Sequence, residues 1–205
     1  RKTVAKKTSA KSAVRLNDVK TGGNDRIVTG IREFDRVMGG GIVRDSVTII
    51  TSPPGGGKST LALSVCQSAA KQGLNVLYAS GEESESQIKR RADRILEKID
   101  ENIWITADTC MDNVLEEIKN TKADVVIIDS IQTFALNEML PSRAGNPVQT
   151  MECAGELVKI AKNSSKKTAV IIIGQMNKND ELAGLRSLEH LVDTVLVMDS
   201  SYDDG

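Results

Sequence analysis

The chain carries Ser52-Pro53-Pro54-Gly55-Gly56-Gly57-Lys58-Ser59-Thr60 between the apolar run Val47 to Ile50 and the helix-like run Leu61 to Val65. This pattern predicts a strand, a glycine-rich turn and a helix. Glycines let backbone N–H groups converge on an anion, and a helix start adds the positive end of its dipole. Lys58 can reach terminal phosphates, while Ser59 offers a hydroxyl to Mg²⁺. The pattern therefore predicts a P-loop that binds a nucleoside triphosphate.

One position departs from the full P-loop pattern. The pattern has glycine five positions before the glycine that precedes lysine, and here that position is Ser52. A glycine-rich turn without a ligand is the alternative interpretation, but the glycine–lysine–serine half is intact. We therefore expect residues Pro54 to Thr60 to bind ATP, and we expect Ser52 to affect the geometry of the loop rather than its class.

The composition is that of one soluble globular domain. The chain has 205 residues, 40% of them hydrophobic, and a formal net charge of −1, so nucleic-acid binding would need a local basic patch or loops pooled from several subunits. No run approaches the roughly 18 apolar residues of a membrane-spanning helix. Cys66, Cys110 and Cys153 are widely separated, as expected of reduced thiols. We expect a cytoplasmic protein that does not bind membranes.

The first residues differ from the rest. Residues 1–19 are rich in Lys, Ser, Thr and Ala, with Asp18 as their only acid. We interpret residues 1–24 as a basic flexible linker or a trimmed terminus. An organelle transit peptide, which would place the protein in a stroma or matrix, and a nucleic-acid-binding arm are the alternatives. Residues 25–205 then form the folded domain.

Apolar runs and helical patterns alternate along that domain. The runs continuous enough for strands buried on both faces are residues 47–50, 76–79, 103–105, 125–128, 170–173 and 194–198. Helical patterns occur at residues 30–38, where three glycines follow, and at 61–72, 86–99, 111–119 and 148–163. Such alternation predicts an α/β fold, a mostly parallel twisted sheet with helices on both faces. Ligands of such sheets bind along the carboxyl ends of the strands.

Polar residues stand at those strand ends. Asp129 ends the run 125–128 and could hold Mg²⁺ opposite Ser59, although aspartate also ends strands simply because turns begin there. Glu82 follows another run and could polarise the water that attacks the γ-phosphate. For the neighbouring Glu83, capping the helix expected to begin near residue 86 is the better interpretation.

Gln175 ends the run 170–173 and could sense the γ-phosphate and signal its presence to residues 176–185; a surface amide in a turn is the alternative. Arg143, Lys178 and Arg186 lie in loops and could contact the phosphates of DNA, although solvated loop charge is the ordinary explanation. With only two Phe, two Tyr and one Trp, DNA binding should be mainly electrostatic.

Several motifs, in order, resemble the ATPase domain of the bacterial RadA (Sms) family of DNA repair proteins. They extend over most of the chain, from about residue 26 to 198. The motifs are Arg26-Ile27-Val28-Thr29-Gly30-Ile31, Phe34-Asp35-Arg36-Val37-Met38-Gly39-Gly40-Gly41, Ser80-Gly81-Glu82-Glu83-Ser84, Ile128-Asp129-Ser130-Ile131-Gln132-Thr133 and Leu188-Glu189-His190-Leu191-Val192-Asp193-Thr194-Val195-Leu196.

The resemblance implies a RecA-like P-loop NTPase core. Members resemble the DnaB helicase in forming ATP-driven hexameric rings that move along single-stranded DNA and promote branch migration during recombination. It further implies that Lys58, Ser59, Glu82, Asp129 and Gln175 surround one triphosphate, with the Gln175 strand between the P-loop strand and the Asp129 strand. By the same resemblance, loops after the Asp129 and Gln175 strands face the ring channel, so Arg143 and Lys178 become candidates for DNA contact.

The chain departs from the family in several places. The family usually has glycine at Ser52, histidine at Gln175, arginine at Met151 and proline at Leu185. Full-length members also carry a four-cysteine zinc module and a Lon-protease-like domain, which this sequence lacks. We therefore expect either an excised core or a naturally short relative.

The sequence-based hypothesis is a DNA-dependent ATP hydrolase that uses ATP and Mg²⁺. Its expected partners are single-stranded DNA, further copies of the chain and other recombination proteins. A KaiC-like ATPase or kinase is one alternative. A nucleotide-gated regulator with little hydrolysis is the other, because Ser52 could leave binding intact while turnover is lost.

Overall fold

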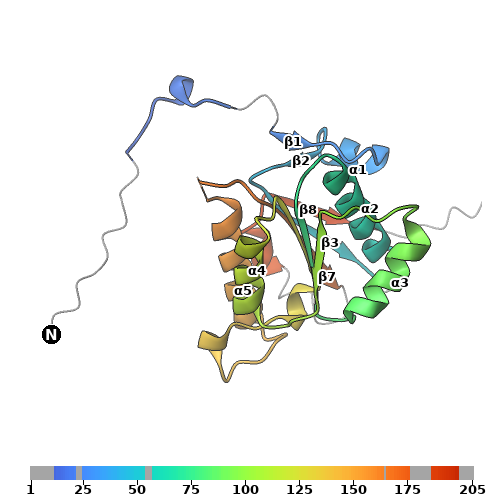
Figure 1. Cartoon of the computed structure of the whole chain (residues 1–205). Coiled ribbons are helices and arrows are strands. Elements are labelled where there is room, and N and C mark those ends of the chain that lie inside the picture. Colours follow the sequence, from blue (N-terminus) through green and yellow to red (C-terminus); the bar gives the residue numbers. More distant parts are fainter. Residues whose placement is uncertain (1–11, 22–24, 54–56, 164, 176–185, 199–205) are drawn as a thin grey trace, which may run out of the picture.

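Six parallel strands form the main sheet of the computed structural model, which describes residues 12–21, 25–53, 57–163, 165–175 and 186–198. The strand order is β5-β4-β6-β7-β3-β8, and each neighbouring pair is parallel (Figure 1). The strands are β3 (Val47–Ser52), β4 (Val76–Ser80), β5 (Ile103–Thr106), β6 (Val125–Asp129), β7 (Ala169–Gln175) and β8 (Thr194–Val197). The predicted α/β class and mostly parallel sheet are confirmed.

The inner strands are buried on both faces. Every residue of β3, β4 and β6 is buried, and so is β7 up to its last residue. Unbroken runs of valine and isoleucine suit this position, because helices cover both faces of a parallel sheet. The outer strands β5 and β8 are only partly buried, as expected at the two edges.

Helices cover the two faces in separate groups. Figure 1 shows α4 and α5 on one side of the sheet and α1, α2 and α3 on the other. Each group packs its own apolar cluster against the sheet, the first including Phe134 and Leu157 and the second including Leu63 and Ile88. The helices are α1 (Arg32–Val37), α2 (Lys58–Lys71), α3 (Glu85–Ile95), α4 (Met111–Asn120) and α5 (Pro147–Ala161). Helices on both faces are therefore confirmed.

A two-stranded antiparallel ribbon, β1 (Arg26–Ile27) with β2 (Ile42–Val43), flanks α1 and was not predicted. The glycines between α1 and β2 all have positive φ, as the predicted helix end requires. Gly41 has a second reason to be glycine, because a Cβ there would lie 2.6 Å from the Ile27 carbonyl oxygen.

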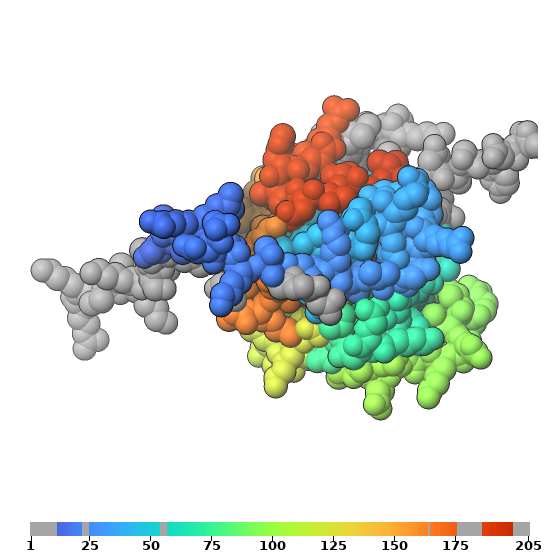
Figure 2. All heavy atoms as spheres, turned by 90° about the horizontal axis from the view of Figure 1, so that it is seen from above, coloured from blue at the N-terminus to red at the C-terminus, as the bar shows by residue number. Residues whose placement is uncertain are grey.

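Short 3₁₀ helices occur at η1 (Leu16–Asp18), η2 (Ile131–Thr133) and η3 (Asn137–Met139). Residues 12–21, which include η1, are all exposed and extend away from the body of the domain (Figures 1 and 2). The linker at residues 1–24 stays a prediction, and residues 1–11 and 22–24 lie outside the described residues.

Cys66, Cys110 and Cys153 are free thiols in the structure. Burial raises the pKa of Cys66 and that of Cys153 to about 12, so both thiols stay protonated and unreactive. Within the described ranges, no cluster of His, Cys, Asp and Glu could hold a metal ion by itself. No described helix is long and apolar enough to cross a membrane.

Candidate nucleotide site

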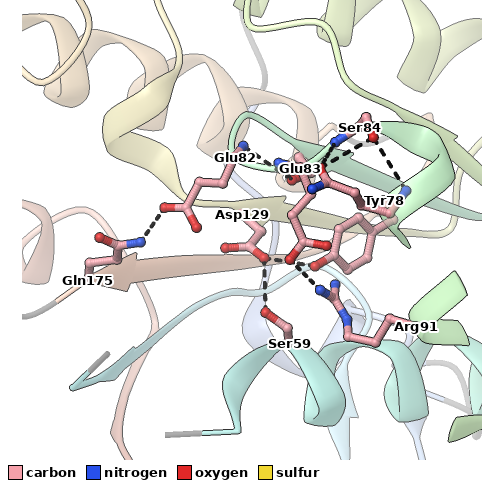
Figure 3. A network of polar contacts seen from close by, with 10 residues as sticks. Ser59, Tyr78, Glu82, Glu83, Ser84, Arg91, Asp129 and Gln175 are labelled. Atoms are coloured by element: carbon pink, nitrogen blue, oxygen red, sulfur yellow. Dashed lines mark hydrogen bonds and ion pairs between the residues drawn. The ribbon is translucent and has the colours of Figure 1, made fainter. Parts of the chain in front are cut away.

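The parallel register brings the predicted site residues to one edge of the sheet. Ser80 pairs with Asp129 at the ends of β4 and β6, and Ser52 pairs with Gln175 at the ends of β3 and β7. Strand β7 lies between β3 and β6, which is the order that the family resemblance implied. Figure 3 shows Ser59, Glu82, Asp129 and Gln175 gathered at this edge.

The glycine-rich turn of the P-loop ends at Gly57, and α2 begins at Lys58. Gly57 has a φ of 76° in the left-handed region, which glycine adopts without strain. The predicted contacts Pro54, Gly55 and Gly56 lie outside the described residues, whereas Thr60 lies in the first turn of α2. No acidic side chain occupies that first turn, so the positive end of the helix dipole is left for an anion.

Lys58 is buried, with only 8% of its surface exposed. Its Nζ atom has no hydrogen-bond partner among the residues that the structure describes. A buried ammonium without a partner is costly, and this cost falls when an anion such as a phosphate lies beside it. The position of Lys58 therefore fits a triphosphate.

Ser52, the departure from the full motif, is fully buried at the last position of β3. Its hydroxyl donates a hydrogen bond of 3.2 Å to the Pro53 carbonyl oxygen. The serine side chain thus satisfies its own polar group within the strand end. This agrees with the expectation that Ser52 leaves the P-loop class unchanged.

Asp129 faces the start of α2 and is 2% exposed. Its Oδ2 atom accepts hydrogen bonds from the Tyr78 hydroxyl at 2.8 Å and from the Ser59 hydroxyl at 3.4 Å. Its Oδ1 atom is buried and has no partner within the described part of the chain. Mg²⁺ prefers oxygen ligands, so an orphaned Oδ1 on a carboxylate whose other oxygen contacts Ser59 fits a magnesium ion.

Glu82 and Gln175 contact each other directly. The Gln175 side-chain amide donates a hydrogen bond to Glu82 Oε1, and the Ser130 hydroxyl donates to the same atom at 3.0 Å. The backbone carbonyl oxygen of Gln175 in turn accepts a hydrogen bond of 3.5 Å from the Gln132 side-chain amide. The predicted water-orienting acid is therefore held by Gln175 at the end of β7 (Figure 3) and by Ser130 just after β6.

Glu83 does not cap the next helix, so that interpretation of the sequence is wrong. Helix α3 begins at Glu85, and Ser84 forms a capping box with Gln87. Glu83 instead forms an ion pair with Arg91 on the side of α3. The hydroxyl of Ser84 accepts from the backbone N–H of Gln87 in the first turn, which leaves Glu83 available for the guanidinium.

Gly81 permits the close approach of two loops at the site. A Cβ at this position would lie 1.9 Å from Thr133 Oγ1 and 2.6 Å from Thr133 Cβ. No rotation of the threonine removes the second clash, so the chain that carries Glu82 would have to move away from η2.

We predict that Gly81→Ala destabilises the domain by about 1–3 kcal/mol and lowers ATP turnover, because overpacking displaces the neighbouring Glu82. Differential scanning calorimetry should show a melting temperature several degrees lower. The matched control is Gly155→Ala in α5, where a Cβ meets nothing within 4 Å and alanine should be neutral or stabilising. Equal melting temperatures for the two variants would contradict the close approach.

The predicted DNA contacts are less well defined by the structure. Arg143 is exposed in the segment between η3 and α5, which follows the Asp129 strand. Arg186 is exposed at the start of a helical turn at residues 186–189. Lys178 lies outside the described residues. Their role in DNA binding stays a prediction.

Sequence reasoning missed two residues that lie behind the site. Tyr78 was included in an apolar strand, and Arg91 was not singled out from the charged residues of its helix. A signal for Tyr78 did exist, because a tyrosine in a strand buried on both faces needs a partner for its hydroxyl. Nothing in the local pattern indicates that this partner is Asp129.

Comparisons with known proteins agree with this geometry. Residues 10–181 match the AAA domain family. The chain is 44% identical over 193 residues to the DNA repair protein RadA of Campylobacter jejuni, covering 94% of this chain and 42% of that protein. It is 45% identical over 183 residues to the DNA repair protein RadA of Streptococcus pyogenes, covering 89% of this chain and 39% of that protein.

A third relative, the DNA repair protein RadA of Chlamydia pneumoniae, is 40% identical over 193 residues, covering 94% of this chain and 42% of that protein. The chain thus spans about two fifths of the length of these curated relatives. The match to the AAA domain begins at residue 10, inside the segment predicted as a linker. The chain belongs to the AAA domain family, which implies nucleotide binding, and the resemblance to RadA is confirmed.

Proposed function

We propose that this chain is a Mg²⁺-dependent ATPase that couples hydrolysis to single-stranded DNA in DNA repair and recombination. The observation that carries the proposal is the meeting of a P-loop lysine, an aspartate beside the P-loop serine, and a glutamate–glutamine pair at one sheet edge. The relatives named DNA repair protein RadA support the process in which it acts.

Each of the described site residues has a separate role in the proposed hydrolysis. Lys58 places a positive charge where negative charge develops on the transferring phosphoryl group, and Ser59 and Asp129 are positioned to hold Mg²⁺, which neutralises phosphate charge when bound. Glu82 is exposed and can orient a water molecule toward the γ-phosphorus. The water oxygen forms the new bond to phosphorus and gives up a proton that Glu82 accepts, the bond to the bridging oxygen breaks, and ADP and phosphate leave.

Gln175 links this chemistry to the rest of the chain. Its amide contacts Glu82, and its strand ends immediately before residue 176. An amide that can exchange Glu82 for a γ-phosphate oxygen would move with the state of the nucleotide. This supports a role for Gln175 as a reporter of γ-phosphate occupancy.

DNA and further subunits complete the proposal. Arg143 and Arg186 are exposed and could neutralise phosphates, and the scarcity of aromatic residues favours electrostatic binding with little sequence preference. We also propose assembly into a hexameric ring, with a neighbouring copy completing each ATP site, and the resemblance to RadA supports this part of the proposal. We place the protein in the cytoplasm by the same reasoning.

The test is an ATPase assay with and without single-stranded DNA, run together with a size measurement in nucleotide. We expect DNA to raise turnover several-fold. Arg143→Ala should weaken this stimulation and reduce the slope of log affinity against log salt by about 0.7 for each DNA phosphate that the variant no longer neutralises. Lys119→Ala, an exposed charge at the end of α4, is the control and should change neither quantity.

Two outcomes would count against an ATPase that couples hydrolysis to single-stranded DNA. Tight ATP binding with negligible phosphate release, with or without DNA, would favour a nucleotide-gated regulator. Hydrolysis that DNA does not change, or phosphate transferred to the protein itself, would favour a KaiC-like enzyme.

A further inference from the structure

Tyr78 lies in the interior of the domain, four residues before the glutamate of the site. It is fully buried in β4, within the apolar cluster that α2 and α3 cover. In the sheet register, Tyr78 is opposite Ile127 and Ser80 is opposite Asp129. Side chains two residues apart in a strand share a face, so Tyr78 and Asp129 lie on the same face of neighbouring strands.

The tyrosine hydroxyl reaches the carboxylate along this face. It donates a hydrogen bond of 2.8 Å to Asp129 Oδ2, and both groups are buried (Figure 3). Burial above all, and then the negative charge of Asp129, raises the pKa of Tyr78. In this contact the hydroxyl is the donor and the carboxylate oxygen is the acceptor.

The two oxygens of the Asp129 carboxylate have different contacts. Oδ2 is held by Tyr78 and by the longer contact from Ser59, whereas Oδ1 is buried without a partner among the described residues. Because Oδ2 is fixed from within the sheet, the direction in which Oδ1 points is fixed as well. A carboxylate with a single anchored oxygen presents the other one for coordination.

An ion pair lies beside the hydrogen bond between Tyr78 and Asp129. Arg91 comes from α3, its side chain is 15% exposed, and it forms an ion pair with Glu83. Figure 3 shows its guanidinium close to the Tyr78 hydroxyl and to Asp129. The guanidinium thus places positive charge beside the carboxylate that accepts the tyrosine hydrogen bond.

We propose that Tyr78 is a positioning residue for the magnesium site: its hydroxyl anchors Asp129 Oδ2 so that Oδ1 faces the metal held with Ser59. The proposal rests on the proposed nucleotide function. Tyr78 touches neither nucleotide nor water in this scheme. Its effect is transmitted through one hydrogen bond to a carboxylate, so its loss should alter the requirement for metal.

The first test is the magnesium dependence of binding of a fluorescent ATP analogue. Tyr78→Phe removes only the hydroxyl, and we expect the Mg²⁺ concentration at half-maximal binding to rise about tenfold, as for other partners of metal ligands. Binding measured in EDTA should stay the same. An unchanged magnesium dependence would overturn the positioning role.

The control for losing a buried hydroxyl is Thr168→Val. Thr168 is 2% exposed and precedes β7 at the opposite end of the sheet, where its hydroxyl lies 3.4 Å from the Ala123 carbonyl oxygen. This variant should keep the wild-type magnesium dependence. A similar rise in both variants would assign the effect to general loosening of the core.

A second test needs no nucleotide, so it separates this proposal from the proposed function. Melting temperatures are measured in metal-free buffer for wild type, Tyr78→Phe, Asp129→Ala and the double variant. Tyr78→Phe should lower the melting temperature when Asp129 is present. In the Asp129→Ala background, the same change should be neutral or stabilising. Equal losses in both backgrounds would overturn the contact, whereas failure of wild type to bind ATP would remove only the proposed function.

Discussion

Replacement of Lys58 by alanine is expected to abolish ATP hydrolysis, with turnover at least about a hundredfold below wild type, as when a single charge-stabilising donor is removed from an active site. The Lys58 ammonium is buried at the start of α2 and has no partner in the described protein, so it is available to the terminal phosphates. Phosphate release, measured with purified protein at saturating ATP, checks this prediction.

This loss should not come from unfolding. Removal of a buried, unpaired positive charge from the N-terminus of a helix relieves an unfavourable interaction, so the melting temperature of Lys58→Ala should equal or exceed that of wild type. Lys71→Ala, an exposed position at the other end of α2, is the matched control and should retain turnover. Normal hydrolysis by Lys58→Ala would remove the P-loop assignment altogether.

Replacement of Glu82 by glutamine should lower turnover by about a hundredfold or more while ATP affinity is retained, since general base catalysis contributes about 10²–10⁴-fold. Glutamine keeps an oxygen that can accept from Ser130 and Gln175, so the loop should keep its shape. The variant loses only the negative charge that polarises water. Single-turnover kinetics and fluorescent-nucleotide binding separate the two effects.

Glu85→Gln is the control for this experiment. Glu85 is an exposed acid in the first turn of α3, three residues from Glu82, and its loss should leave turnover close to wild type. Equal losses in the two variants would indicate a general electrostatic effect of the region. A fully active Glu82→Gln would show that another group orients the water.

The fold was predictable because its strongest signals are local. Unbroken apolar runs such as Val125 to Ile128 can only be strands buried on both faces, and the helical patterns between them require parallel crossovers. The gathering of Asp129 and Gln175 at one edge then follows from the direction of the strands. The place of β7 between β3 and β6 came only from the resemblance to a known family, and the rest of the strand order was not predicted.

The contacts that complete the site were not predictable in the same way. The hydrogen bond between Tyr78 and Asp129 joins residues 51 positions apart, and it depends on the register of β4 against β6. The partner of Glu83 was missed because Ser84 also fits the start of a helix, and only the structure decides between two acceptable caps. The ribbon of β1 and β2 is too short to leave a periodic pattern.

The pairing of β3 affects how the chain can fold while it is being translated. Both of its ladders are made with strands from the last part of the chain, β7 and β8. Since ribosomes add about 5–20 residues per second, β3 waits on the order of ten seconds for both neighbours to be translated. A nascent chain that stops before residue 169 leaves β3 unpaired on both sides. ATP therefore cannot assist folding before β7 and β8 have been translated, and the unpaired β3 of a growing chain is a natural target for chaperones.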